Sequence, residues 1–375
     1  MIFNRKDDKR IEGVSDRRSV SRGSPIDPIA DYRRRWKRSF TLILFFTLLV
    51  FLFPIFTISL GAMSISWIDI GRILAAKITG NSDFAEGISR GAQAIVWELR
   101  FPRILCGLLA GAGLAVAGVI FQGILQNPLA DPYTLGISSG AAFGASLAIL
   151  LNISGGLFIS ASLSALIFAS LTLVLVTLIA GRGGGLSGVN LIMAGIIVSS
   201  IFQAGISFMK VLSGENVGAI VFWLMGSLTA KSWKEAALLA WVIFPAAILA
   251  FRFAGSLNIL SLGSQEAESL GVNVKRTRFF YMALGAAITA VCVSVCGIIG
   301  FIGLIVPHLL RYSVTSDNRL LIPLSALSGG ILLAAADTCV RMLGSGEIPV
   351  GALTTLLGGP FFIYIFIRRT GTRSI

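Results

Sequence analysis

Long stretches without any charged side chain constrain this chain more than any other feature. The first runs from Ser39 to Ile68 without Asp, Glu, Lys or Arg. The further runs are 104–130, 132–181, 183–209, 236–251, 279–310, 320–336 and 348–367. A helix that crosses the ~30 Å hydrocarbon layer of a membrane needs about 20 apolar residues. Only 13% of the 375 residues are charged, against roughly 25% in soluble domains. The sequence therefore predicts a polytopic membrane protein, all-α because a lipid-exposed strand edge is not tolerated.

The lengths of these runs indicate about ten transmembrane helices. The first helix is expected from Phe40 onward. The run 132–181 is too long for one crossing and is interrupted at Asn152–Gly156, so it predicts two helices. The run 279–310 predicts one full helix and then a short one, with a bend between Gly297 and Gly303. Polar loops are expected at 69–98 and 215–235, the second with a short interfacial helix over 217–225.

The basic residues predict the orientation in the membrane. Twelve of the 31 Lys and Arg residues precede Phe40, so residues 1–39 are expected to form a disordered cytoplasmic arm. With the N-terminus inside, 22 basic residues face the cytoplasm and nine face outward, as the positive-inside rule requires. Residues 40–367 then form a single transmembrane domain in the cell inner (plasma) membrane, and 368–375 form a cytoplasmic tail. Without a basic-aromatic recognition fold, no nucleic-acid partner is expected.

Three of the outward-facing basic residues stand apart. Arg100 and Arg103 are one helical turn apart around Pro102, at the start of a span, where cations oppose the helix dipole. Arg341 lies four residues after Asp337, near the outer end of another span. Two interpretations stay open for the three arginines: docking of an acidic partner, or local pairing within the chain.

The predicted cytoplasmic segment from Gln265 to Arg278 has the pattern of a short surface helix. Its acids include Glu266, near the positive end of a helix dipole, followed by Ala267 and Leu270. Gly271 is a natural helix end because it adopts positive φ without strain. Lys275, Arg276 and Arg278 then mark a membrane edge. We expect a contact surface for a partner; the alternative is a solvated linker.

A glycine-rich stretch follows the predicted second span. Gly136, Gly140 and Gly144 repeat every four residues and predict a close-packed helix face. Asn127 and Pro128 indicate a turn. Gln122 is a polar group at membrane depth and predicts either a side chain lining a pathway or a helix–helix hydrogen bond. Thr354 and Thr355, in the last span, pose the same choice, with a bond to a backbone carbonyl favoured.

The sequence lacks the residue patterns of nucleotide binding, of catalysis and of metal binding. No phosphate-binding Gly-x-x-x-x-Gly-Lys-Ser/Thr motif, catalytic triad or paired membrane carboxylate occurs, so we expect neither an enzyme nor a cofactor. His308 is the single histidine and has no acid or cysteine beside it, so no metal site is expected. An ion-coupled secondary transporter is an alternative, although such proteins carry ionisable residues in mid-membrane, and only Asp337 lies near a span.

Three strings together resemble the FecCD-type permease family. The first is Glu266-Ala-x-x-Leu-Gly-Val with the basic cluster and Gly297–Arg311. The second is Gln122-x-x-x-x-Asn-Pro-Leu-Ala-Asp-Pro132, and the third is Glu347-Ile-Pro-Val-Gly351. The resemblance covers roughly Phe40 to Ile367.

The resemblance implies the fold of a type II ABC importer permease. Such a permease carries an iron chelate (siderophore), haem or a corrinoid inward as a homodimer, driven by two copies of a separate ATPase subunit. The segment with Glu266, Ala267, Leu270 and Gly271 would then lie in a cleft of the ATPase. The arginines at 100, 103 and 341 would receive glutamates of a substrate-binding protein on the outer face.

Overall fold

The regular structure of this chain is helical throughout the part that is described. The computed structural model describes residues 28–61, 63, 65–156, 158–343 and 348–371. Its helices are α1 (Pro28–Ser59), α2 (Trp67–Thr79), α3 (Arg90–Ala94), α4 (Phe101–Ile124), α5 (Ile137–Gly155), α6 (Ala161–Arg182), α7 (Gly188–Leu212), α8 (Val217–Leu224), α9 (Trp233–Arg252), α10 (Ala254–Leu260), α11 (Ser264–Ser269), α12 (Val274–Cys296), α13 (Ile302–Ser313), α14 (Asn318–Met342) and α15 (Val350–Gly371). The predicted all-α fold is confirmed.

Eight helical segments in the described residues are long and apolar enough to cross a membrane. They contain α1, the continuous helix 90–124, α5, α6, α7, α9, α12 and α14. The short helix α13 and the last helix α15 complete the ten segments expected from the charge-free runs. The expected short helix over 217–225 is α8.

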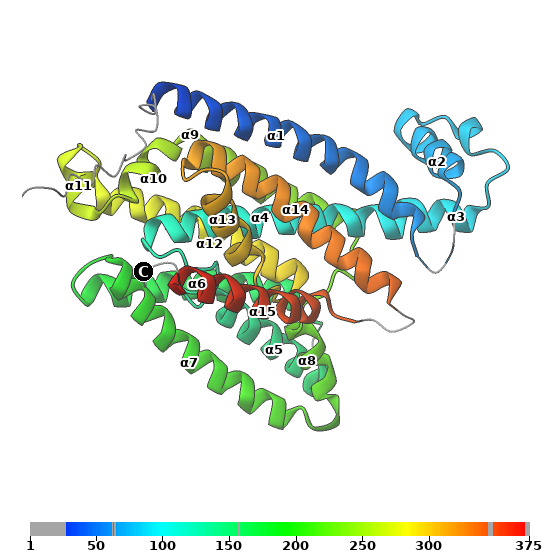
Figure 1. The fold of residues 1–375 in the computed structure, drawn as a ribbon. Coiled ribbons are helices and arrows are strands. Elements are labelled where there is room, and N and C mark those ends of the chain that lie inside the picture. Colours follow the sequence, from blue (N-terminus) through cyan, green and yellow to red (C-terminus); the bar gives the residue numbers. More distant parts are fainter. Residues whose placement is uncertain (1–27, 62, 64, 157, 344–347, 372–375) are drawn as a thin grey trace, which may run out of the picture.

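Helix α4 is the centre of the bundle (Figure 1), and nearly all of its side chains are buried. It packs against α14 because both helices carry glycine at their crossing. A Cβ atom added at Gly111 would lie 2.3 Å from the carbonyl oxygen of Gly329. A Cβ added at Gly118 would lie 1.8 Å from the carbonyl oxygen of Gly303, where α4 meets α13. Small residues thus allow the backbones to approach closely.

The predicted bend in the run 279–310 is confirmed. Helix α12 ends at Cys296, and Gly297 follows with φ 71°. Helix α13 begins at Ile302, after Phe301, which has φ 69°. Positive φ is uncommon for a bulky residue and costs free energy, so the surrounding packing holds this break in place.

Helix bounds near the N-terminus differ from the prediction. Helix α1 begins at Pro28 rather than at Phe40, so it includes part of the expected arm. Most of α2 lies within the expected polar loop 69–98, and this helix has Ser66 as its N-cap and Gly80, in the left-handed region, as its C-cap. The loop prediction was wrong because it counted charges and did not weigh the two caps, which satisfy the free backbone groups of the helix ends.

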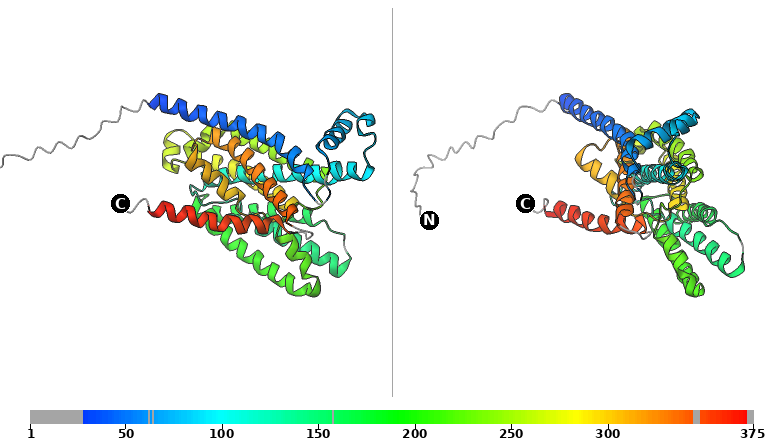
Figure 2. Two further views of the ribbon diagram at one scale, coloured as in Figure 1. Left: turned by 45° about the vertical axis from the view of Figure 1, so that its right-hand side comes forward. Right: turned by 90° about the vertical axis from the view of Figure 1, so that its right-hand side faces the viewer.

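The start of α1 and the end of α15 lie at the same end of the bundle, together with α10 and α11 (Figure 2). Helix α2 lies at the opposite end. Most of the expected arm, the last four residues of the expected tail, and residues 344–347 lie outside the described residues.

Candidate functional site

The segment predicted as a partner contact is a capped helix, α11. The N–H of Gly271 donates to the carbonyl oxygen of Glu268 at 3.0 Å. The N–H of Val272 donates to the carbonyl oxygen of Ala267 at 2.9 Å. These two bonds form a Schellman motif, which requires a left-handed residue at the position of Gly271, and its φ is 79°. The prediction that Gly271 ends the helix is confirmed.

Helix α11 presents different residues to solvent and to the protein. Glu266 is exposed, and the Leu270 side chain is 60% exposed. Ala267 is fully buried in the main hydrophobic core. A short helix seated by one small residue, with an acid and a leucine facing outward, offers a fixed surface with both apolar and charged character.

Arg278 anchors this segment from inside the protein. Its guanidinium donates to the carbonyl oxygen of Leu186, in the α6–α7 connection, and to the hydroxyl of Ser264 at the start of α11. Arg278 is buried against the protein, which the sequence did not indicate, and its place at the membrane edge stays a prediction. Lys275 and Arg276 are exposed. The difference arises because Arg278 lies on the face of α12 that turns toward α11.

A second anchor comes from the turn between α4 and α5. The Nε2 atom of Gln126 donates to the carbonyl oxygen of Leu260 at 2.8 Å. Leu260 is the last residue of α10, four positions before α11 begins. The predicted turn at Asn127 is confirmed, because its Oδ1 accepts the N–H of Leu129 at 2.9 Å. The α4–α5 turn is therefore bonded directly to the segment that carries α11.

The same turn also holds the break between α12 and α13. Asp131 accepts the backbone N–H of Tyr133 at 2.9 Å and the hydroxyl of Thr134 at 3.0 Å. Burial raises the pKa of the Asp131 carboxyl, and its hydrogen bonds with Thr134 and Tyr133 oppose that shift. The Tyr133 hydroxyl donates to the carbonyl oxygen of Ile299 at 2.7 Å. Turn, break and α11 therefore form one hydrogen-bonded unit.

The polar side chains at membrane depth bond to backbone. Gln122 is buried and its Nε2 donates to the carbonyl oxygen of Leu304 on α13 at 3.2 Å. Thr354 and Thr355 both donate to the carbonyl oxygen of Gly351. The predicted hydrogen bond between helices is confirmed for Gln122, and the predicted bond to a backbone carbonyl is confirmed for Thr354 and Thr355. A role of Gln122 in lining a pathway stays a prediction.

The predicted packing face on α5 is confirmed for Gly140 and Gly144 and was wrong for Gly136. A Cβ added at Gly140 would lie 1.8 Å from the hydroxyl oxygen of Thr172 on α6. At Gly144 it would lie 2.5 Å from the carbonyl oxygen of Ser164, also on α6. Gly136 has φ 75° and approaches α7 instead. Gly140 and Gly144 therefore share one seam, and Gly136 serves as the turn into α5.

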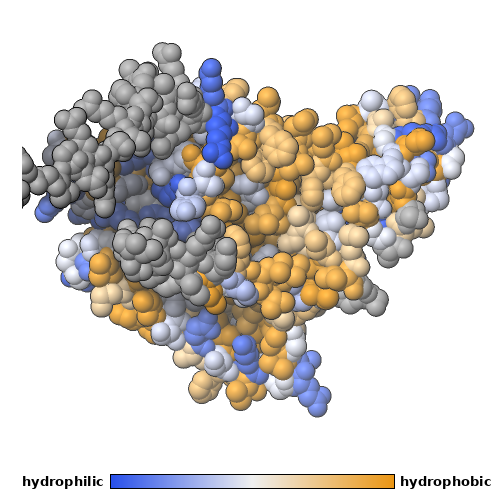
Figure 3. Space-filling view, in the orientation of Figure 1, coloured by the Kyte–Doolittle hydropathy of each residue, from blue (hydrophilic) through white to orange (hydrophobic). Residues whose placement is uncertain are grey.

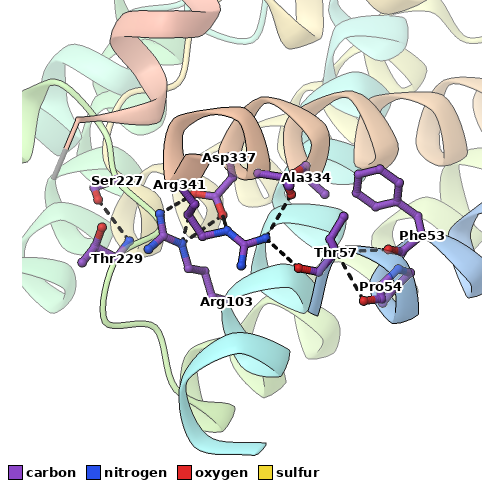
Figure 4. A network of polar contacts seen from close by, with 10 residues as sticks. Phe53, Pro54, Thr57, Arg103, Ser227, Thr229, Ala334, Asp337 and Arg341 are labelled. Atoms are coloured by element: carbon purple, nitrogen blue, oxygen red, sulfur yellow. Dashed lines mark hydrogen bonds and ion pairs between the residues drawn. The ribbon is translucent and has the colours of Figure 1, made fainter. Parts of the chain in front are cut away.

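At the opposite end of the bundle, Arg103 and Arg341 share one carboxylate (Figure 4). Arg103, on α4, donates to both oxygens of Asp337 at 2.8–3.1 Å. The Nε of Arg341 lies 3.5 Å from Asp337, and its NH2 also reaches the carbonyl oxygen of Thr57 on α1. The Asp337 side chain is 2% exposed. The triad of Arg103, Asp337 and Arg341 joins α4 to α14, reaches α1 through the Thr57 carbonyl, and carries one uncompensated positive charge.

Arg100 lies in the interior. Its NH1 donates to the carbonyl oxygen of Ile58 and its NH2 to that of Met63, both at 2.6 Å. It is 8% exposed. The local-pairing alternative therefore describes Arg100, because its guanidinium satisfies carbonyl groups where α1 ends. Docking of a partner at Arg103 and Arg341 stays a prediction.

Sequence reasoning missed the roles of Gln126, Tyr133 and Arg278. Gln126 lies within the string Gln122–Pro132 that carries the family resemblance and Tyr133 directly follows it, so this string is the signal that could have directed attention to them. No local pattern identifies their partners, because those partners lie on other helices. Within the described ranges, no group of three or more His, Cys, Asp or Glu side chains is placed to hold a metal ion.

Comparison with solved structures supports the arrangement. The fold superposes with a TM-score of 0.75 on a structure of an inward-facing conformation of a protein assigned to the metal-chelate type of ABC transporter. The two sequences are 32% identical, and the similarity covers 88% of this chain and 99% of the other.

Curated relatives are permeases of import systems. The cobalamin import system permease BtuC of Halobacterium salinarum is 42% identical, over 76% of each chain. The molybdate import system permease MolB of Haemophilus influenzae is 37% identical, over 86% of this chain and 95% of its own. The hemin transport system permease HmuU of Yersinia pestis is 38% identical, over 74% and 85%.

The family match extends over residues 47–368. This range includes α11, the α4–α5 turn, the break between α12 and α13, and the triad around Asp337. The chain belongs to the FecCD transport family.

Proposed function

We propose that this membrane-spanning permease imports a metal chelate: an iron chelate, haem or a corrinoid. Its family consists of ABC importer permeases, which work with a separate ATPase and a substrate-binding protein and carry out no covalent chemistry of their own. The cobalamin and haemin permeases among its relatives support this class of cargo. The molybdate permease shows that the family also serves a simpler oxyanion.

The observation that carries the proposal is the double attachment of α11. An ATPase can move a permease only through a contact that is exposed outward and held rigidly inward. Glu266 and Leu270 supply the exposed surface. Gln126 and Arg278 supply the attachments, to the α4–α5 turn and to α12. A movement of α11 would thereby reach the helices that surround α4 and switch access by a change of packing.

We place α11 and both termini in the cytoplasm. The proposal rests on the excess of basic residues on that side and on the common end of the bundle shared by α11, the start of α1 and the end of α15 (Figure 2). Exposed Lys275 and Arg276 at the start of α12 belong to the same side.

At the outer end, we assign binding-protein docking to Arg103 and Arg341. Their guanidinium groups share a single carboxylate, so an acidic side chain from a partner would find one positive charge unbalanced. Arg100 would act indirectly, by fixing the end of α1.

We also propose that two copies of the permease assemble with two copies of the ATPase, as the family resemblance implies. The mass of the purified complex, measured by light scattering with detergent correction, would test this stoichiometry. A complex with one permease would contradict it.

The coupling proposal is tested by the double variant Glu266→Lys with Leu270→Asp. Neither side chain packs in the core, so insertion and folding should be retained. We expect the ATPase either to dissociate or to hydrolyse ATP without uptake of substrate in proteoliposomes. The matched control is Glu215→Lys, an exposed acid on the connection between α7 and α8, which should leave both activities unchanged. Normal uptake with the ATPase still bound to the double variant would reduce α11 to a linker.

A further inference from the structure

Helix α2 has an apolar face that the protein itself covers. Ile70, Ile73 and Ala76 are spaced by three residues and are buried. Ile70 and Ile73 pack with Ile58 at the end of α1 and with Val96, in a small core separate from the main one. This face explains why the helix is folded, and it uses one side of the helix only.

A second apolar face of α2 is not covered. Ile68 and Ile78 are 75% and 76% exposed. Between them, Gly71 is exposed and Ala75 is partly exposed. The spacing of three, four and three residues places all four on one side of the helix. Single exposed apolar residues are ordinary, but a continuous apolar strip marks a contact surface.

This strip adjoins a surface that already faces lipid. The ring of Trp67, at the start of α2, lies 5.8 Å from the ring of Phe56 on α1. Phe56 is 53% exposed, and Leu52, one turn earlier, is 52% exposed. Helix α1 is a membrane span with little of its apolar surface buried in the protein. Tryptophan is enriched where spans meet the membrane–water interface, so the strip begins at the membrane boundary.

Arg72 borders the strip beside Ile68, but its guanidinium is held by the connection that follows α2, and Asp69 accepts a hydrogen bond from Ser66. Arg72 donates to the carbonyl oxygens of Phe84 and Glu86 in the following connection. Lys77 is exposed. Successive residues are ~100° apart around a helix, so its side chain points away from that of Ile78. In Figure 3 the hydrophobic surface over α1 continues onto the region of α2, and hydrophilic atoms gather at the outer tip.

We propose that α2 is a membrane-surface helix whose strip, formed by Trp67, Ile68, Gly71, Ala75 and Ile78, is immersed in the interfacial layer of the bilayer where α1 ends. The occupant of the strip is lipid. An amphipathic helix of this kind lies in the plane of the membrane with its apolar side at the boundary of headgroups and acyl chains. Its second face, against Ile58 and Val96, would fix the end of α1 to that boundary. The inference goes beyond transport and does not depend on α11.

Spin-label accessibility tests the proposal on the full-length protein. The background is Cys339→Ala, because Cys339 is the exposed cysteine and Cys106, Cys292 and Cys296 are buried. Nitroxides are attached to Ile68→Cys and Ile78→Cys, with Lys77→Cys as the neighbouring control. In phosphatidylcholine–phosphatidylglycerol nanodiscs, we expect the ratio of collision with oxygen to collision with a water-soluble nickel chelate to be several-fold higher at 68 and 78 than at 77.

Two results would overturn the inference. Equal access of the nickel chelate to positions 68, 77 and 78 would show that the strip faces water. Protection of 68 and 78 from both reagents would show that protein, rather than lipid, covers it. The three side chains are exposed, so substitution removes no packing, and a monodisperse elution profile confirms folding before labelling.

Discussion

The hydroxyl of Tyr133 bonds twice to one residue, Ile299. It donates to the carbonyl oxygen of Ile299 at 2.7 Å and accepts its backbone N–H at 3.2 Å. Ile299 lies between α12 and α13, where the backbone is not helical and needs other partners. A buried peptide group without hydrogen bonds is costly, above all at membrane depth. One side chain therefore stabilises the broken helix and ties it to the α4–α5 turn.

Replacing Tyr133 with Phe should destabilise this region. It removes the hydroxyl and leaves both polar groups of Ile299 without that partner, which costs about 1–3 kcal/mol. We expect a lower unfolding midpoint of the purified protein and reduced substrate uptake, with the ATPase still bound. Tyr312→Phe is the control, since Tyr312 is 84% exposed. Equal midpoints for the two variants would show that the double bond to Ile299 contributes nothing.

Substitutions at Gly271 should rank by their tolerance of the left-handed conformation. Open space surrounds this position, so backbone strain rather than a clash decides the outcome. Asn tolerates this conformation and should retain most uptake, whereas Val should lose it because its backbone is strained by roughly 1–2 kcal/mol or more. ATP hydrolysis measured beside uptake separates loss of coupling from loss of binding. Uptake with Val equal to that with Asn would argue against the cap as a coupling element.

A single methyl group at Gly144 should disturb the α5–α6 seam. The new Cβ would meet the backbone carbonyl of Ser164 at 2.5 Å, and a backbone atom cannot rotate away. We expect Gly144→Ala to cost about 1–3 kcal/mol, seen as a lower midpoint in thermal unfolding. Gly181→Ala, on α6, is the matched control, because nothing lies within 4 Å of its added Cβ. Both variants behaving alike would mean that the helices can separate at no cost.

Removing the carboxylate of Asp337 should be more harmful than removing either arginine. Asp337→Ala leaves Arg103 and Arg341 facing each other, with their exposure limited to 19% and 10%. Loss of one partner from a buried ion pair costs about 3–5 kcal/mol, whereas Arg103→Ala still leaves Arg341 to pair with Asp337. Chemical denaturation in detergent would rank the variants, with exposed Lys234→Ala as control. A smaller loss for Asp337→Ala than for Arg103→Ala would contradict a shared carboxylate.

The number of spans, the bend after Cys296 and the end of α11 at Gly271 could be predicted from the sequence. Each depends on a local property. Exclusion of charge from lipid acts on every run of about 20 residues separately, and the ability of glycine to adopt positive φ without strain does not depend on its tertiary surroundings. The spacing of four residues between Gly140 and Gly144 likewise indicates a packing face before the partner helix is known.

Only the tertiary structure decided what the polar residues do. Arg100 and Arg103 are one turn apart in sequence, yet one binds the end of α1 and the other binds Asp337 on α14. Gln126 and Tyr133 find carbonyl groups 134 and 166 residues away. Hydropathy is a property of a segment and can be read along the chain, whereas a hydrogen bond requires two groups within about 3 Å. Which groups meet at that distance is fixed by the packing of helices around α4.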